Sequence, residues 1–171
     1  QIIIFIYAKT KMKKFIYLFT LALLFTSCDY FKSADDFFAQ AEKMRTDGNP
    51  QGALLSLDKI TSKFADHSRA PEAQYLKAEI LYRDLQNYSK SIAEYERFAI
   101  QFPENKKVPF SIFMQGFIFA NELMSHDSAK VYYKKFINRY PNHEMIESVK
   151  FELKYLGIGI NEIPELKHLT E

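Results

Sequence analysis

The sequence predicts an all-α protein, an α-solenoid of antiparallel helix hairpins. Two observations predict it: a period of 38 residues that recurs about 3.5 times, and apolar residues at helical spacing inside each period. The composition agrees, because 47% of the 171 residues are hydrophobic and only five are Gly and six Pro. Such a chain is typical of a folded, helix-rich domain and not of a disordered one.

Six sets of positions repeat in register at this same step along the chain. The columns are Phe37, Tyr75, Phe113 and Phe151; Ala53, Ser91 and Ala129; Leu57, Tyr95 and Tyr133; Ile60, Phe98 and Phe136; Phe64, Phe102 and Tyr140; Ala65, Pro103 and Pro141. One column could align by chance, but six columns over three or four units indicate a true repeat. We expect the aromatic columns to form the core, and Phe113→Ala to cost about 3–5 kcal/mol, as buried Phe truncations do.

Each repeat reads as two helices. Ser91, Tyr95 and Phe98 stand at i, i+4 and i+7, on one face of a helix. Prolines after the second helix stop it, and prolines at the start of the next first helix lose no hydrogen bond there. Pro164 is expected to begin a short helix over the open end. The predicted helices lie near 34–47, 50–63, 70–85, 88–101, 108–123, 126–139 and 143–157.

These patterns resemble the tetratricopeptide repeat, a helical hairpin with small residues at the helix crossing, an aromatic residue in the second helix and a terminal Pro. The segment from Gln86 through Pro103 carries the match best, and Ala78 and Gly116 resemble the small position of the first helix. The chain departs from the family in a period longer than the usual one of about 34 residues. It also has Ala65 at the place of the first terminal Pro. The resemblance implies a right-handed superhelix whose concave face is lined by first helices.

The N-terminal residues resemble a lipoprotein signal peptide. Met12-Lys13-Lys14 precedes a short apolar run, Phe15 to Phe25, and Thr26-Ser27-Cys28 follows. The run is too short to span a bilayer, which needs about 20 apolar residues. The resemblance implies that Cys28 is acylated and becomes the mature N-terminus. An ordinary secretory signal or an uncleaved anchor helix remains the alternative.

The chain is therefore divided as follows. We expect residues 1–11 to be upstream, non-native translation, 12–27 the signal peptide, 28–33 a linker, 34–157 the array (34–69, 70–107, 108–145 and the half repeat 146–157), and 158–171 a capping tail. Longer repeats behind such a leader resemble the BamD-like outer-membrane assembly lipoproteins and other periplasmic repeat proteins. In some bacteria an Asp directly after the cysteine, as Asp29 is here, retains a lipoprotein in the inner membrane, but this rule is not general. We therefore expect the outer membrane, and the inner membrane is the alternative.

The family resemblance places a partner-binding groove on the first helices. The candidate groove residues are Phe38, Glu42, Arg45, Leu76, Ile80, Arg83, Met114, Ile118 and Asn121. Apolar residues flanked by charges suit a partly apolar segment of another envelope protein. In the alternative interpretation, Leu76, Ile80, Met114 and Ile118 belong to the core.

No pattern for catalysis or metal binding emerges from the sequence. His67, His126, His143 and His168 have no metal-ligand spacing, and no P-loop or nucleophile motif occurs. We expect His67 and His143, which stand two periods apart, to lie in equivalent turns. Four lysines but no acids precede Cys28, so the remaining 19 basic and 21 acidic residues leave the body near −2 and disfavour nucleic acid.

The sequence thus predicts a membrane-anchored adaptor that is not an enzyme and needs no cofactor. It would hold envelope proteins at the periplasmic face of the outer membrane, as in outer-membrane protein assembly. A carrier lipoprotein for a peptide or a glycan is the alternative.

Overall fold

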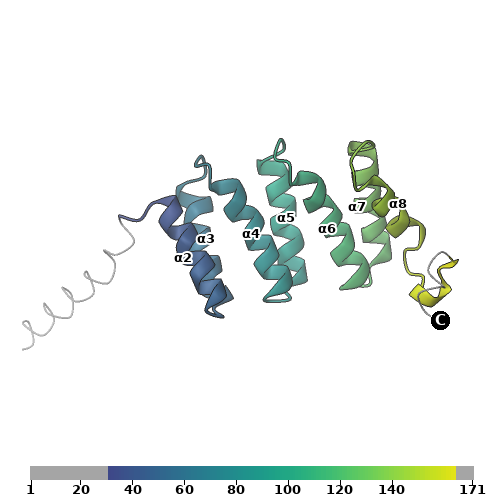
Figure 1. Ribbon diagram of the computed structural model, residues 1–171, viewed down its shortest axis with the longest axis horizontal. Coiled ribbons are helices and arrows are strands. Elements are labelled where there is room, and N and C mark those ends of the chain that lie inside the picture. The colour runs from purple at the N-terminus through teal and green to yellow at the C-terminus, as the bar shows by residue number, and fades with distance from the viewer. Residues whose placement is uncertain (1–30, 165–171) are drawn as a thin grey trace, which may run out of the picture.

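The structure, a computed structural model, describes residues 31–164 as a row of helices (Figure 1). The helices are α2 (Ala34–Thr46), α3 (Pro50–Lys63), α4 (Ala70–Arg83), α5 (Tyr88–Gln101), α6 (Val108–Asn121), α7 (His126–Arg139), α8 (Ile146–Lys154) and the 3-10 turn η1 (Ile160–Glu162). Within these residues there is no strand, so the all-α prediction is confirmed.

The helices form three hairpins, α2/α3, α4/α5 and α6/α7, with α8 packed on α7 at the C-terminal end. Each helix packs chiefly on the helices before and after it in the chain. The result is the elongated array of Figure 1, in which the first and last helices lie at opposite ends. Packing mainly between chain neighbours is characteristic of a solenoid, so the predicted helical repeat is confirmed.

Local sequence sets where the helices begin. Ser33 and Asp36 form a reciprocal capping box before α2. The side chains of Asn49 and Asn87 accept backbone N–H bonds at the starts of α3 and α5. Helices α4 and α6 have no such cap, but each carries a Pro within its first two positions, where no N–H is required.

The turns inside the three hairpins share one unusual backbone conformation. Gly48, Gln86 and Met124, which occupy the same place in successive repeats, have φ angles of 77°, 49° and 49°. This left-handed region suits glycine, which only the first turn supplies. The repeat therefore extends to backbone geometry that the side-chain columns do not reveal.

The core lies where the two helices of a hairpin cross. Ala53, Ser91 and Ala129 are fully buried there, and the Ser91 hydroxyl donates to the Ala78 carbonyl at 2.8 Å. A Cβ at Gly116 would lie 2.7 Å from the Tyr133 ring, so the close approach requires glycine. The small positions expected from the sequence are thus true crossing points.

The first-helix aromatic column divides into two halves. Phe37 and Tyr75 are buried, as predicted, with 2% and 5% of their surface exposed. Phe113 and Phe151 pack on neighbouring side chains but stay half-buried. The expectation that the whole column is buried core therefore fails for these two, which are more exposed than Phe37 and Tyr75.

Helix α8 is shorter than the predicted 143–157 and ends at Lys154. Its counterpart α6 runs through Asn121, and the positions equivalent to the last turn of α6 are 155–159. Gly157 takes a φ of 80°, which breaks the helix, and any side chain there would meet the His126 ring at 2.8 Å. The short η1 helix forms before Pro164. Pro164 itself has 3-10 geometry, and the rest of the short helix predicted to begin there lies outside the described residues.

Candidate partner-binding surface

The predicted lipid anchor, Cys28, lies outside the described residues, so its acylation stays a prediction. Within residues 31–164, no helix is long and apolar enough to cross a membrane.

The nine predicted groove residues fall into two groups. Ile80 and Ile118 are fully buried, and Phe38 and Met114 are 5% and 8% exposed. These four support the surface from beneath and offer a partner little or nothing to touch directly. Glu42, Arg83 and Asn121 are exposed, and Leu76 and Arg45 are half-buried. The accessible part of the candidate groove is therefore mainly polar.

Electrostatic contacts divide the accessible residues further. The Arg45 guanidinium binds the Asp84 carboxylate at 2.6 Å and thereby joins α2 to the end of α4. Arg83 forms no ion pair within the described part of the chain and keeps its charge in solvent. Asn121 donates from its amide to the Phe117 carbonyl at 3.0 Å, which leaves its side-chain oxygen available. Arg83 and Asn121 are thus the predicted groove residues best placed to meet a partner.

A buried polar cluster between α3, α4 and α5 was not foreseen. Lys77 is only 8% exposed along its side chain, and its ammonium group lies 2.7 Å from Asp58 and 3.3 Å from Glu94. The Gln74 amide donates to Glu94 in the same cluster. The signal was in the sequence, because Gln74 and Lys77 interrupt the apolar face of a first helix. The cluster joins three helices.

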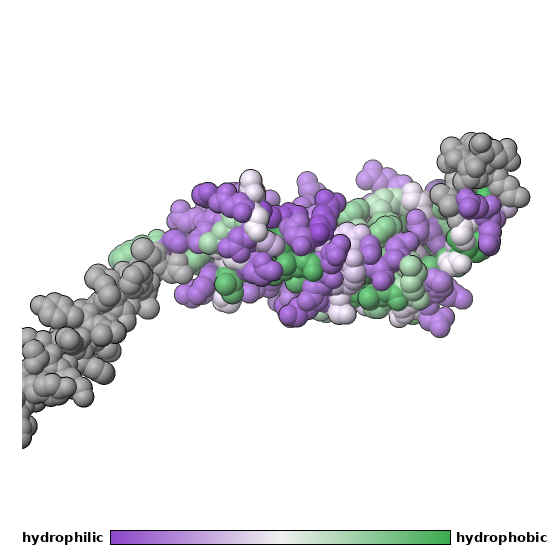
Figure 2. All heavy atoms as spheres, turned by 90° about the horizontal axis from the view of Figure 1, so that it is seen from below, coloured by the Kyte–Doolittle hydropathy of each residue, from purple (hydrophilic) through white to green (hydrophobic). Residues whose placement is uncertain are grey.

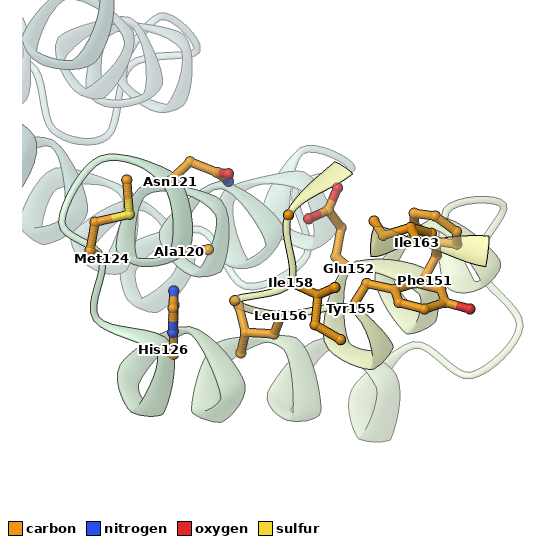
Figure 3. Close-up of a pocket in the computed structure, with 12 residues that line it drawn as sticks. Ala120, Asn121, Met124, His126, Phe151, Glu152, Tyr155, Leu156, Ile158 and Ile163 are labelled. Carbon is orange, nitrogen blue, oxygen red and sulfur yellow. The ribbon is translucent and has the colours of Figure 1, made fainter. Parts of the chain in front are cut away.

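A hollow of about 570 Å³ lies at the C-terminal end of the array. It opens where α8 stops short, between the end of α6, the start of α7 and the chain after α8 (Figure 3). Its lining residues are Ala120, Asn121, Met124, His126, Phe151, Glu152, Tyr155, Leu156, Gly157, Ile158, Gly159 and Ile163. Asn121 is the only predicted groove residue among them.

Glu152 is the acidic group of this hollow. It is half-buried, and burial raises the pKa of its carboxyl group above the ordinary value of 4.5. The carboxyl group lies near the hydroxyl of Tyr133, a residue with no exposed surface. That hydroxyl has no fully formed hydrogen bond in residues 31–164. Glu152 occupies the column of Phe38, Leu76 and Met114, and this break in an apolar column is the signal that could have identified it.

Two of the four histidines lie where the repeat predicted them, and His168 lies outside the described residues. His67 and His143 occupy equivalent turns, and the Nδ1 atom of each accepts the backbone N–H two residues later at 3.2 Å. His126 lines the C-terminal hollow instead. Across residues 31–164, no group of three His, Cys, Asp or Glu side chains could hold a metal ion.

The array matches a known family model over nearly all of its described length. The model of YfiO, described as an outer membrane lipoprotein, matches residues 31–157. The chain belongs to this family. No curated protein matches the chain significantly. The YfiO match covers every helix of the array from α2 to α8, and so confirms the BamD-like lipoprotein expected from the repeats.

Proposed function

We propose that the chain is an adaptor lipoprotein that holds other envelope proteins during outer-membrane protein assembly. The YfiO family match over residues 31–157 carries this proposal. An array of hairpins offers a long surface whose side chains can be changed without altering the fold, and such surfaces serve protein binding. The proposed role includes no catalytic step and no cofactor.

The accessible residues of the first helices are proposed as the contact surface. Arg83 and Asn121, on α4 and α6, are exposed at equivalent repeat positions. Arg45, at the same position of α2, is engaged by Asp84. A partner lying across the first helices would therefore meet one free charge and one free amide oxygen, which suits a segment with hydrogen-bonding and acidic groups.

The proposed anchor is Cys28, which would place the array at the membrane surface. A tether raises the effective concentration of the array near other envelope proteins. We propose the periplasmic face of the outer membrane as the site, in keeping with the family. Metabolic labelling with a palmitate analogue, compared between wild type and Cys28→Ala, tests the anchor: equal labelling of the two would refute it.

Site-specific photo-crosslinking in cells tests the adaptor role. A photoreactive phenylalanine derivative at position 83 should crosslink to a protein of the outer-membrane β-barrel assembly machinery. The matched control carries the same photoreactive residue in place of Lys130. Lys130 is exposed on α7, the second helix of its hairpin, and so lies outside the proposed contact surface on the first helices. Gentle solubilisation and affinity purification should recover the same protein in stoichiometric amount. Purification of the chain with a bound peptide or glycan and no protein would contradict the adaptor role and favour a carrier.

A further inference from the structure

The C-terminal hollow joins an unpaired acidic group to apolar walls. Glu152 forms no ion pair within residues 31–164, although its side chain is half-buried. The other residues at its repeat position are apolar: Phe38, Leu76 and Met114. A carboxyl group placed at an apolar position loses hydration when ionised and regains stability only through a partner.

The earlier repeats place no acid at this position. The apolar members of the column fill space between helices in the earlier repeats, two of them with under a tenth of their surface exposed. In the last half repeat, α8 stops at Lys154, and the space that a longer helix would fill remains open. Glu152 therefore lines a hollow, and its carboxyl group lies near the Tyr133 hydroxyl of α7.

The walls of the hollow suit a long side chain with a charged end. Met124, Leu156 and Ile158 supply aliphatic surface, and Phe151 and Tyr155 supply aromatic rings. In Figure 3 the polar ends of Asn121 and Glu152 lie on facing sides of the opening. Arginine matches this combination, because its stem packs on apolar surface, its guanidinium stacks on aromatic rings, and its N–H groups fit carboxylate and amide oxygens.

Tyr133 gives the carboxyl group support from behind. Its hydroxyl is buried and lies near Glu152 without a complete hydrogen bond among the described residues. A small rotation of the Glu152 side chain would let one carboxylate oxygen accept from Tyr133. The other oxygen would then remain free to accept from a ligand at the mouth of the hollow.

We propose that the hollow binds an arginine side chain from an extended segment of a partner protein, with Glu152 as its counter-ion. This inference rests on the proposed adaptor function, which it deepens by naming the chemistry of one anchor residue. The volume of about 570 Å³ lies within the range of about 300–1,000 Å³ typical of ligand clefts, so residues beside the arginine also enter.

Methionine-methyl NMR of the full chain in detergent micelles provides a local test. Met124 lines the hollow and reports binding there, whereas Met44 on α2 lies at the other end of the array and serves as the internal control. The probes are acetyl-Leu-Arg-Leu-amide and the same peptide with uncharged citrulline. The arginine peptide should shift the Met124 signal but not the Met44 signal, and bind about tenfold more tightly than the citrulline peptide, as a charge-assisted hydrogen bond predicts.

Two variants assign the effect to the proposed acid. Glu152→Gln keeps the shape and removes the charge, so it should bind both peptides with equal, weak affinity. Glu147→Gln is the matched control, because Glu147 lies on the same helix, is well exposed and pairs with Lys150. It should retain the tenfold preference. Unfolding curves of both variants exclude loss of fold as the cause.

Three results would overturn the inference: no shift of the Met124 signal, equal affinity of wild type for both peptides, or an unchanged preference in Glu152→Gln. Each of these results leaves the crosslinks from position 83 unaffected, so the adaptor role and the arginine site can fail separately.

Discussion

The two ends of the array use the same repeat plan for different purposes. The N-terminal hairpins are joined by ion pairs, with Arg45 bound to Asp84 and Lys77 held between Asp58 and Glu94. The C-terminal hairpin is also joined to the second one by an ion pair, Lys135 with Glu96, but this part leaves exposed apolar side chains around an open hollow. Its exposed large hydrophobic residues include Phe110, Leu123, Met124 and Ile158. Figure 2 shows the difference, with green surface gathered mainly over the C-terminal half.

The two ends therefore differ in what their side chains contribute to stability and to binding. Ion pairs between repeats restrain how one hairpin packs on the next, whereas the half-buried Phe113 and Phe151 leave contact area for another protein. Exposed apolar patches at the end of a folded array mark interaction surfaces when they are contiguous. The comparison therefore predicts that substitutions of the buried and ion-paired residues of α2 to α5 act mainly on folding. Substitutions of the residues that line the hollow near α8 should act mainly on binding.

The largest expected effect is a loss of unfolding free energy, and it is tested at two members of one aromatic column. Phe37→Ala should lower the free energy of unfolding by about 3–5 kcal/mol, because Phe37 is 2% exposed. Phe113→Ala should cost less, since Phe113 is half-buried and its ring partly faces solvent. Chemical denaturation of both variants measures the difference. Equal losses would show that the C-terminal half is as tightly packed as the N-terminal one, and would contradict the proposed difference between the two ends.

A somewhat smaller loss of unfolding free energy is expected when the crossing of α6 and α7 is overpacked. In Gly116→Ala the new Cβ would lie 2.7 Å from the Tyr133 ring, so the ring or the helix must move. Overpacking of this kind costs about 1–3 kcal/mol. Ala120→Gly on the same helix removes a methyl group without any clash and should cost about 1 kcal/mol through helix propensity, so it gives the scale for a change of the same size. A Gly116→Ala variant as stable as wild type in thermal unfolding would mean that this crossing is looser than described.

The repeat made most of the fold predictable from sequence. The predicted starts of six helices, α2 to α7, agree with the structure, because Pro, Asn and the aromatic columns mark local events that depend on nearby residues. The early end of α8 was not predicted, although Gly157 with its φ of 80° marks it. The approach of His126, which leaves no room for a side chain at position 157, could not be seen because His126 lies far away in the sequence. In the candidate site, periodicity placed Ile80 and Ile118 near the groove but could not show that they lie beneath it.

A smaller effect concerns the pH dependence of stability at the C-terminal hollow. Burial raises the pKa of Glu152 above 4.5, so the folded chain holds this proton at a pH where the unfolded chain has lost it. Glu152 therefore lowers stability progressively as the pH rises from about 4.5 through its folded pKa. Glu152→Gln should remove that decline and be at least as stable as wild type at pH 7.

The measurement is a denaturation series from pH 4 to pH 8 on both proteins. His126 lines the same hollow in each, so only the difference between the two curves reports on Glu152. Parallel curves would show that Glu152 is fully hydrated in the free chain. That outcome would contradict the proposed contrast between the two ends, since the ionised Glu152 carboxylate would then cost the C-terminal end no stability.

The smallest expected effect tests the three hairpin turns. Gln86 and Met124 adopt a φ of 49°, where side chains are strained, whereas Gly48 supplies glycine at the equivalent place. Gln86→Gly should therefore raise the free energy of unfolding by up to about 1 kcal/mol, because relief of left-handed strain exceeds the entropy that glycine adds to the unfolded chain. Gly48→Ala should lower the free energy of unfolding for the converse reason.

Met124→Gly tests stability and binding in one variant. It should raise the free energy of unfolding as Gln86→Gly does, but weaken peptide binding at the hollow that Met124 lines. A Met124→Gly variant with unchanged binding would show that the exposed methionine contributes nothing to the C-terminal surface.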